Sequence, residues 1–218
     1  MTKRKTGAKI NIAVLASGGG TNLQALIDAE RERTLRDGRI ALVVSDHATA
    51  YALTRAEQAG IRTAVVEKQS SRAEFEERLA AVLTANDIGL VVLAGFMKIL
   101  GASFVERYPN RIINIHPSLI PSFCGKGFYG IKVHEEALAY GVKVTGATVH
   151  FVNEIPDGGE IIMQKAVSVK KGDTPKTLQR RVMEKAEWKI LPRAVQSVCR
   201  DLLRKMTKND QSEGKEEA

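Results

Sequence analysis

The sequence has few cysteines and no long hydrophobic segment. Its two cysteines, Cys124 and Cys199, are too few for a disulfide framework. The longest apolar run, residues 89–97, ends at Lys98 and is about half as long as a membrane-spanning helix. The basic start of the chain leads into no signal-peptide core. These absences predict a cytoplasmic protein that keeps its thiols reduced and does not enter a membrane.

Aromatic residues are also scarce, at 5% of the chain. The net charge is +8, and about half of it comes from a basic tail, residues 1–9. No stripe of Lys and Arg interleaved with aromatic residues appears, so a stacking platform for nucleic acid is not expected. The remaining mild excess of positive charge favours a small anionic ligand.

What is present is the balance of a globular α/β protein, with 44% hydrophobic and 27% charged residues. Short apolar segments alternate with amphipathic ones, which predicts a doubly wound, mostly parallel sheet with helices on both faces. The predicted strands are 9–16, 39–45, 61–66, 90–94 and 111–115, followed by an antiparallel C-terminal pair, 145–152 and 160–169. The predicted helices begin near 21 and span 50–59, 72–85, 104–108, 133–140 and 174–204, the last interrupted at Pro192. We expect one domain, 10–203, between the basic tail and a disordered tail, 204–218.

A glycine-rich turn, residues 17–22 (SGGGTN), follows the first strand. Thr21 or Asn22 is expected to cap the helix that begins there. Backbone N–H groups at a helix start attract anions, so the turn predicts a phosphate site, although a plain βα turn also fits. A nicotinamide site needs a third glycine where Leu23 stands, and no Gly-Lys-Ser/Thr follows for a P-loop.

Polar residues end the fifth strand. Asn114 and His116 are two residues apart, so their side chains leave one face of the strand. An amide and an imidazole that converge can bind an oxyanion and move a proton. Asp157, in a Pro-Asp-Gly-Gly turn, would raise the pKa of His116 if it came close, but spacing does not decide that. A structural histidine and a plain turn are the alternatives. The histidines show no metal-ligand spacing, so no metal is expected.

Four segments then resemble a known family, in order and spacing. They are residues 11–25 (NIAVLASGGGTNLQA), 91–100 (VVLAGFMKIL), 114–121 (NIHPSLIP) and 157–159 (DGG). The chain resembles the phosphoribosylglycinamide formyltransferases of purine biosynthesis from about residue 10 to 203. The resemblance implies a formyltransferase-like Rossmann variant, 10-formyltetrahydrofolate as cosubstrate, no metal, small-molecule partners, and a monomer or homodimer.

The resemblance also implies roles for individual residues. The residue types of the family's catalytic triad match Asn114, His116 and Asp157. Residues implied to bind the ribonucleotide are Gly19, Gly20, Thr21, Asn22, Pro117 and Glu187. Residues implied to lie beside the folate are Arg72, Met97, Lys98, Ile99, Leu100, Asn114, Glu154, Ile155 and Pro156.

Two departures and two other functions stay open. Lys98 stands where many relatives carry arginine, and the loop 122–132 is longer than in some of them. A second phosphate ligand is not assigned, with Arg180, Arg181 and Lys185 as candidates. A formyltetrahydrofolate hydrolase would use the same cluster with water, but those relatives carry an N-terminal regulatory domain. A non-catalytic nucleotide-binding module would use only the glycine turn.

Overall fold

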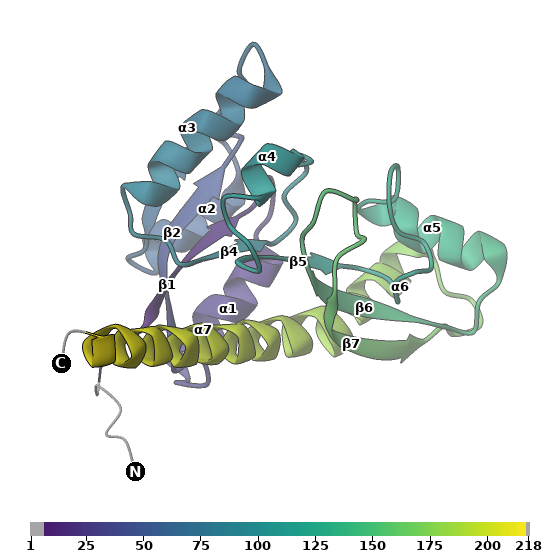
Figure 1. The fold of residues 1–218 in the computed structure, drawn as a ribbon. Helices are drawn as coiled ribbons and strands as arrows, with labels where there is room; N and C mark the ends of the chain where they lie inside the picture. Colours follow the sequence, from purple (N-terminus) through teal and green to yellow (C-terminus); the bar gives the residue numbers. More distant parts are fainter. Residues whose placement is uncertain (1–6, 217–218) are drawn as a thin grey trace.

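The computed structural model describes residues 7–216 and contains a seven-stranded sheet of order β3-β2-β1-β4-β5-β6-β7 (Figure 1). The strands are β1 (Ile10–Leu15), β2 (Gly38–Ser45), β3 (Arg62–Val65), β4 (Leu90–Leu93), β5 (Ile112–His116), β6 (Val144–Phe151) and β7 (Ile161–Ser168). The helices are α1 (Thr21–Arg31), α2 (Tyr51–Gln58), α3 (Arg72–Thr84), α4 (Ala102–Val105), α5 (Ile131–Tyr140), α6 (Pro175–Val182), the π-helical η1 (Met183–Glu187) and α7 (Trp188–Glu216). Strands β1 to β5 are parallel, and β6 and β7 are antiparallel to their neighbours, which confirms the predicted fold class.

The central strands are buried on both faces. Ile12 and Val14 of β1 belong to a hydrophobic cluster with α1 and α7, whereas Ala13 and Leu15 belong to a second cluster with α3. This alternation follows from the two-residue period of a strand, and it explains the continuous apolar run in the sequence. Helix α7 contacts α1 and strands β1, β2, β6 and β7, so it runs along one face of the sheet (Figure 1).

The C-terminal helical region differs from the prediction. The interruption is η1 and not Pro192, which lies inside α7. Pro192 lacks the N–H group that would donate to the carbonyl of Trp188. Trp188 directly follows η1, where the hydrogen-bond register already differs from that of an α-helix, so the missing bond does not break the helix. Residues 204–216 continue α7, although a disordered tail was expected. No proline or glycine precedes Gly214 there, and Arg204 pairs with Asp201 one turn earlier. Most of the basic tail, residues 1–6, lies outside the described residues.

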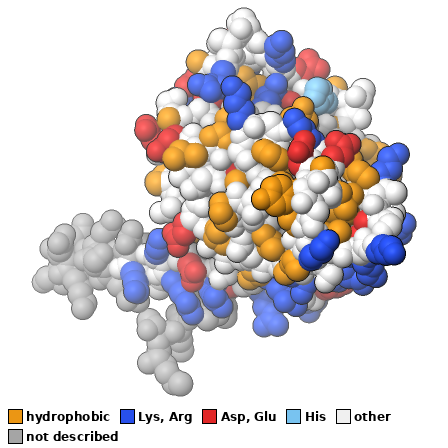
Figure 2. Space-filling model, turned by 90° about the vertical axis from the view of Figure 1, so that its right-hand side faces the viewer, with side chains coloured by type: hydrophobic (Ala, Val, Ile, Leu, Met, Phe, Trp, Pro, Cys, Tyr) orange, Lys and Arg blue, Asp and Glu red, His pale blue; other side chains and the backbone are white. Residues whose placement is uncertain are grey.

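The described surface is mixed in character. The side that carries α5, β6 and β7 shows hydrophobic side chains in small groups, with Lys and Arg along its lower and right-hand margins (Figure 2). The most exposed large apolar residue is Tyr140, at the end of α5. Within residues 7–216, no helix combines the length and the apolar character that a bilayer crossing requires.

His134, on α5, is a buried titratable group without a hydrogen-bond partner in the described part of the chain. Burial, with a smaller contribution from the nearby His116, lowers its pKa to about 4. Between about pH 6.5 and 4, the unfolded chain, with a histidine pKa near 6.5, therefore binds a proton at this residue that the folded chain does not bind. The contribution of neutral His134 to the unfolding free energy is therefore fully present above about pH 6.5 and is lost as the pH falls toward 4.

We predict that His134→Leu flattens the fall in unfolding free energy between pH 6.5 and 4 by about 3 kcal/mol. Urea unfolding at several pH values measures this difference. His47→Leu is the comparison variant, because it removes a histidine whose side chain is 63% exposed. A parental slope in His134→Leu would contradict the prediction.

Candidate active site

The glycine turn after β1 is shaped by contact with α2. Gly20 has a φ of 69° and is the residue that caps α1, without a side-chain hydrogen bond. The expectation that Thr21 or Asn22 caps the helix is therefore wrong, because both residues already lie inside it. A Cβ at Gly20 would lie 2.8 Å from the Cα of Ala52, so only glycine lets α2 approach so closely. The first N–H groups of α1 stay available to an anion.

Asn22 joins the glycine turn to the end of η1. Its Nδ2 donates a 2.6 Å hydrogen bond to Oε2 of Glu187, and both side chains are buried. Burial raises the pKa of the Glu187 carboxyl to about 7, and the hydrogen bond from Asn22 opposes this shift only in part. The Asn22 Oδ1 atom is buried and has no hydrogen-bond partner among the described side chains and backbone. The two residues that the resemblance assigns to one substrate are therefore in contact.

Asn114, His116 and Asp157 come together at the carboxyl end of β5. Oδ1 of Asp157 accepts a 3.4 Å hydrogen bond from Asn114 Nδ2, and its Oδ2 lies 3.5 Å from His116 Nδ1. Asp157 therefore reaches His116, which the sequence left undecided. The Gly125 amide donates to Asp157 Oδ2 at 2.8 Å, so the loop after β5 is held over the cluster.

His150 is a fourth member of the cluster, and sequence reasoning gave it no role. Its Nε2 lies 3.6 Å from Asp157 Oδ1 and 3.2 Å from Asn114 Nδ2. The antiparallel register pairs His150 with Asn114 directly across β5 and β6. The alternation of Thr148 and His150 onto one face of their strand was the signal that could have found it.

The protonation of the cluster differs from the prediction. Burial is the largest influence on His116, and it lowers the pKa of the imidazole below its ordinary value, although Asp157 and the Phe123 carbonyl act in the opposite direction. Burial also opposes ionisation of Asp157. Contacts with His150, His116 and the Gly125 amide together outweigh it and lower the pKa of that carboxyl. The expected raised pKa of His116 is wrong because desolvation of the ring exceeds the attraction of one carboxylate.

The turn that carries Asp157 is held by backbone constraints. Asp157 has a φ of 57°, which aspartate tolerates better than most residues. A Cβ at Gly159 would collide with the carbonyl of Phe151, so the turn requires glycine there. Glu154, Ile155 and Pro156 of the same loop are exposed and available to a ligand.

The residues assigned to the folate divide into exposed and buried ones. Met97 and Ile99 are 52% and 56% exposed, whereas Leu100 is 5% exposed and packs in the cluster around α3. The Leu100 side chain is therefore a core residue, and only its backbone can face a ligand. The Met97 amide donates to Ser17 Oγ at 2.9 Å, which ties this segment to the glycine turn.

A cavity of about 320 Å³ lies beside this segment. Its lining includes Lys68, Arg72, Phe75 and Lys98. Arg72 Nε lies 3.7 Å from a Glu76 oxygen, yet its side chain stays 67% exposed. Lys98 Nζ lies 3.6 Å from Asp46 and 5.1 Å from the centre of the Phe75 ring.

The other sequence candidates are placed as follows. Gly19 is exposed, and Thr21 and Pro117 are half-buried near the same edge of the sheet. Arg180 is paired with Glu184, and Arg181 with Asp173, so both guanidinium groups already face carboxylates. Among the side chains that the structure describes, His, Cys, Asp and Glu form no group of three with metal-binding geometry.

Comparison with known proteins shows the family of this chain. The family model described as Formyl transferase matches residues 10–195. The chain belongs to the formyl transferase family. It is 40% identical to a phosphoribosylglycinamide formyltransferase of Haemophilus influenzae, over 83% of each chain. A glycinamide ribonucleotide transformylase from Symbiobacterium toebii has a similar structure, with a TM-score of 0.85, 42% identity and 92% of each chain covered.

A human trifunctional purine biosynthetic protein, adenosine-3, is 48% identical over 88% of this chain. The chain spans only 18% of that relative. The resemblance seen in the sequence, including its assignment to the phosphoribosylglycinamide branch, is confirmed by these matches.

We predict that Gly20→Ala lowers stability, because alanine meets Ala52 and must adopt a positive φ that costs about 1–2 kcal/mol. A loss of that size corresponds to a Tm lower by about 2–8 °C. Gly19→Ala is the control, because nothing lies within 4 Å of its Cβ position. Thermal unfolding followed by circular dichroism tests both variants, and equal Tm values would refute the close approach of α2.

Proposed function

We propose that the chain transfers the formyl group of 10-formyltetrahydrofolate to the amine of glycinamide ribonucleotide in purine biosynthesis. The observation that supports this most is the meeting of Asn114, His116 and Asp157 at the edge of the sheet that also holds the glycine turn. A cytoplasmic location, the two small molecules as substrates, no nucleic-acid partner, and a monomer or homodimer belong to the same proposal.

The two substrates are assigned to different surfaces. We assign the ribonucleotide phosphate to the N–H groups at the start of α1 and its ribose hydroxyls to Glu187. The rest of this set is Gly19, Gly20, Thr21, Asn22 and Pro117. We assign the folate to the exposed side chains of Met97 and Ile99, the backbone of Leu100, and Arg72, Lys98, Asn114, Glu154, Ile155 and Pro156.

The chemistry follows from the groups around Asp157. The substrate amine attacks the formyl carbon, and the formyl oxygen becomes an oxyanion. When this intermediate collapses, the bond between the formyl carbon and N10 of the folate breaks, and N10 leaves with the proton that the amine gave up. Asn114 donates to the oxyanion, and protonated His116 does so through Nε2, which exchanges the Phe123 carbonyl for the oxyanion. Burial lowers the pKa of His116, so the negative charge that grows on the oxyanion is what favours the protonated ring. Asp157, ionised by its neighbours, stabilises this imidazolium and accepts the proton that leaves the amine.

The direct test is incubation of the protein with 10-formyltetrahydrofolate and glycinamide ribonucleotide, with the products identified by mass spectrometry. Formylated ribonucleotide supports the proposal. Release of formate without any formylated ribonucleotide would instead establish the hydrolase.

We predict that Asp157→Asn lowers kcat by about 10²–10³ and leaves both KM values within a few-fold, because the charge acts in the transition state. Asparagine suits the same turn conformation, so the fold should persist. The pKa of His116 should fall further without the carboxylate. As the pH rises, residual activity should therefore begin to decline at a lower pH than in the parent. Steady-state kinetics across pH measure both effects. Asp201→Asn, on the exposed side of α7, is the control, and near-parental kcat in Asp157→Asn would refute the mechanism.

We predict that Arg72→Ala raises KM for the folate only a few-fold and leaves kcat nearly intact. The Arg72 side chain is 67% exposed, and such screened contacts contribute about 0–1 kcal/mol. Initial rates at varied folate concentration test this prediction. Arg78→Ala is the control, because Arg78 is an exposed arginine on the same helix that also pairs with a glutamate, Glu74. A large fall in kcat would assign Arg72 a different task.

A further inference from the structure

Helix α2 holds the glycine turn through two carbonyl groups. The Ala52 amide donates to the Gly18 carbonyl at 3.0 Å, and Nε of Arg55 donates to the Gly19 carbonyl at 2.8 Å. Arg55 is thus the side chain that fixes the peptide unit directly before Gly20. The resemblance assigns no role to this residue.

The position of these carbonyls sets the direction of the neighbouring N–H groups. In a trans peptide unit the C=O and the following N–H point to opposite sides. With the Gly18 and Gly19 carbonyls turned toward α2, the N–H groups of Gly19 and Gly20 point away from it. Neither N–H has a hydrogen-bond partner in residues 7–216. Arg55 therefore helps to orient the N–H groups of Gly19 and Gly20, which directly precede the free N–H groups at the start of α1.

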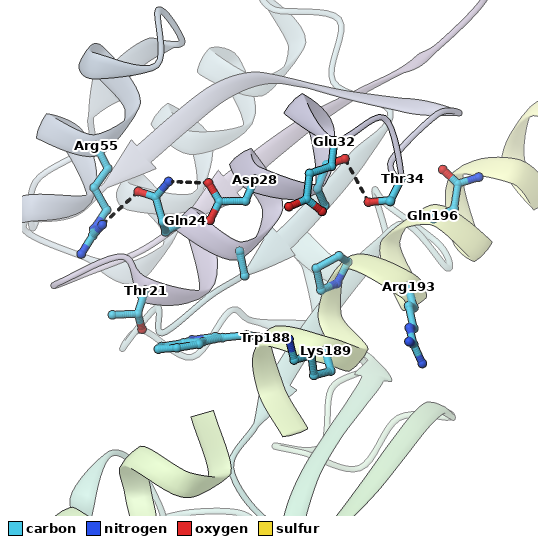
Figure 3. A pocket seen from close by; sticks show the side chains of 13 residues that line it. Thr21, Gln24, Asp28, Glu32, Thr34, Arg55, Trp188, Lys189, Arg193 and Gln196 are labelled. Carbon is cyan, nitrogen blue, oxygen red and sulfur yellow. Dashed lines mark hydrogen bonds between the residues drawn. The ribbon is translucent and has the colours of Figure 1, made fainter. Parts of the chain in front are cut away.

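Arg55 also brings a charge that no carboxylate neutralises in the described part of the chain. One terminal NH donates to Gln24 Oε1 at 2.9 Å, and the guanidinium lies over the Tyr51 ring at 5.0 Å. Nε2 of Gln24 in turn donates to Oδ1 of Asp28, so the partner of this nearby carboxylate is an amide and not Arg55 (Figure 3). Arg180 and Arg181, by contrast, each face a carboxylate.

Arg55 is accessible from solvent beside the turn. With Thr21, Gln24 and Trp188 it lines a cavity of about 610 Å³ between α1 and α7, and Figure 3 shows Arg55 at the same end of this cavity as Thr21. A positive charge there raises the potential at the start of α1 for a dianion.

We propose that Arg55 is a positioning residue for the substrate phosphate. It holds the Gly19 carbonyl so that the N–H groups of the turn face the phosphate, and it supplies an unneutralised positive charge beside them. This inference rests on the proposed function only in naming the phosphate as that of the ribonucleotide.

The test separates the phosphate from the rest of the substrate. Isothermal titration calorimetry without folate measures Kd for glycinamide ribonucleotide and for the same compound without its phosphate. Arg55→Met should weaken binding of the ribonucleotide by about tenfold or more, because a charged hydrogen-bond network is lost, and change binding of the phosphate-free compound less than about twofold. Arg55→Lys should recover only part of the loss, because an ammonium keeps the charge but cannot reach both Gly19 and Gln24 with a planar fork.

Arg31→Met, at the far end of α1, removes the same charge and should change neither Kd. Equal weakening of both compounds by Arg55→Met, or no weakening, would overturn the proposal, and full recovery by Arg55→Lys would overturn the positioning part. If Arg55→Met does not fold, the partial loss expected of Arg55→Lys decides alone.

Titration with inorganic phosphate keeps this result separate from the proposed function. A parent protein that binds phosphate but not the ribonucleotide would refute the assigned substrate. Loss of phosphate binding in Arg55→Met would still support the role of Arg55, and unchanged phosphate binding would overturn it.

Discussion

The carboxylate of Asp157 is the interaction on which the site depends. It meets Asn114 and His116 from β5, His150 from β6 and the Gly125 amide from the loop after β5. A buried carboxylate is costly unless hydrogen bonds and positive charge surround it. Here those partners lower its pKa, and the ionised group joins the paired strands β5 and β6 to the loop after β5 and to its own turn. The same contacts give the imidazole of His116 a partner on the side opposite the Phe123 carbonyl.

Glu187 shows the opposite response of an acid to burial. It has one partner, Asn22, and its pKa rises to about 7, whereas Asp157 has several partners and its pKa falls. Glu187 is the more deeply buried of the two carboxyl groups and has fewer donors, and both differences raise its pKa relative to that of Asp157. A carboxyl that is near half protonation at neutral pH can both donate to and accept from a hydroxyl, which suits the ribose contact proposed for Glu187.

The sequence predicted the alternating strands and helices, the antiparallel pair and the shared face of Asn114 and His116, because periodicity and turn residues are local signals. It did not decide whether Asp157 meets His116, and it missed His150, because both contacts depend on the register between strands far apart in the chain. The direction of the His116 pKa shift was predicted wrongly, since a neighbouring charge is visible in a motif but desolvation is not. The cap at Gly20 escaped prediction because it depends on the approach of Ala52.

The π-helical turn η1 explains how a long C-terminal helix can also serve the site. Regular helix geometry from Pro175 onward would carry Glu187 around the axis by a fixed 100° per residue. The wider turn ends at Glu187 itself, and this is where the carboxyl reaches Asn22. Such turns recur at functional sites because they re-aim one side chain without ending the helix. Helix α7 then continues along the sheet, so one irregular turn separates the segment that binds from the segment that packs.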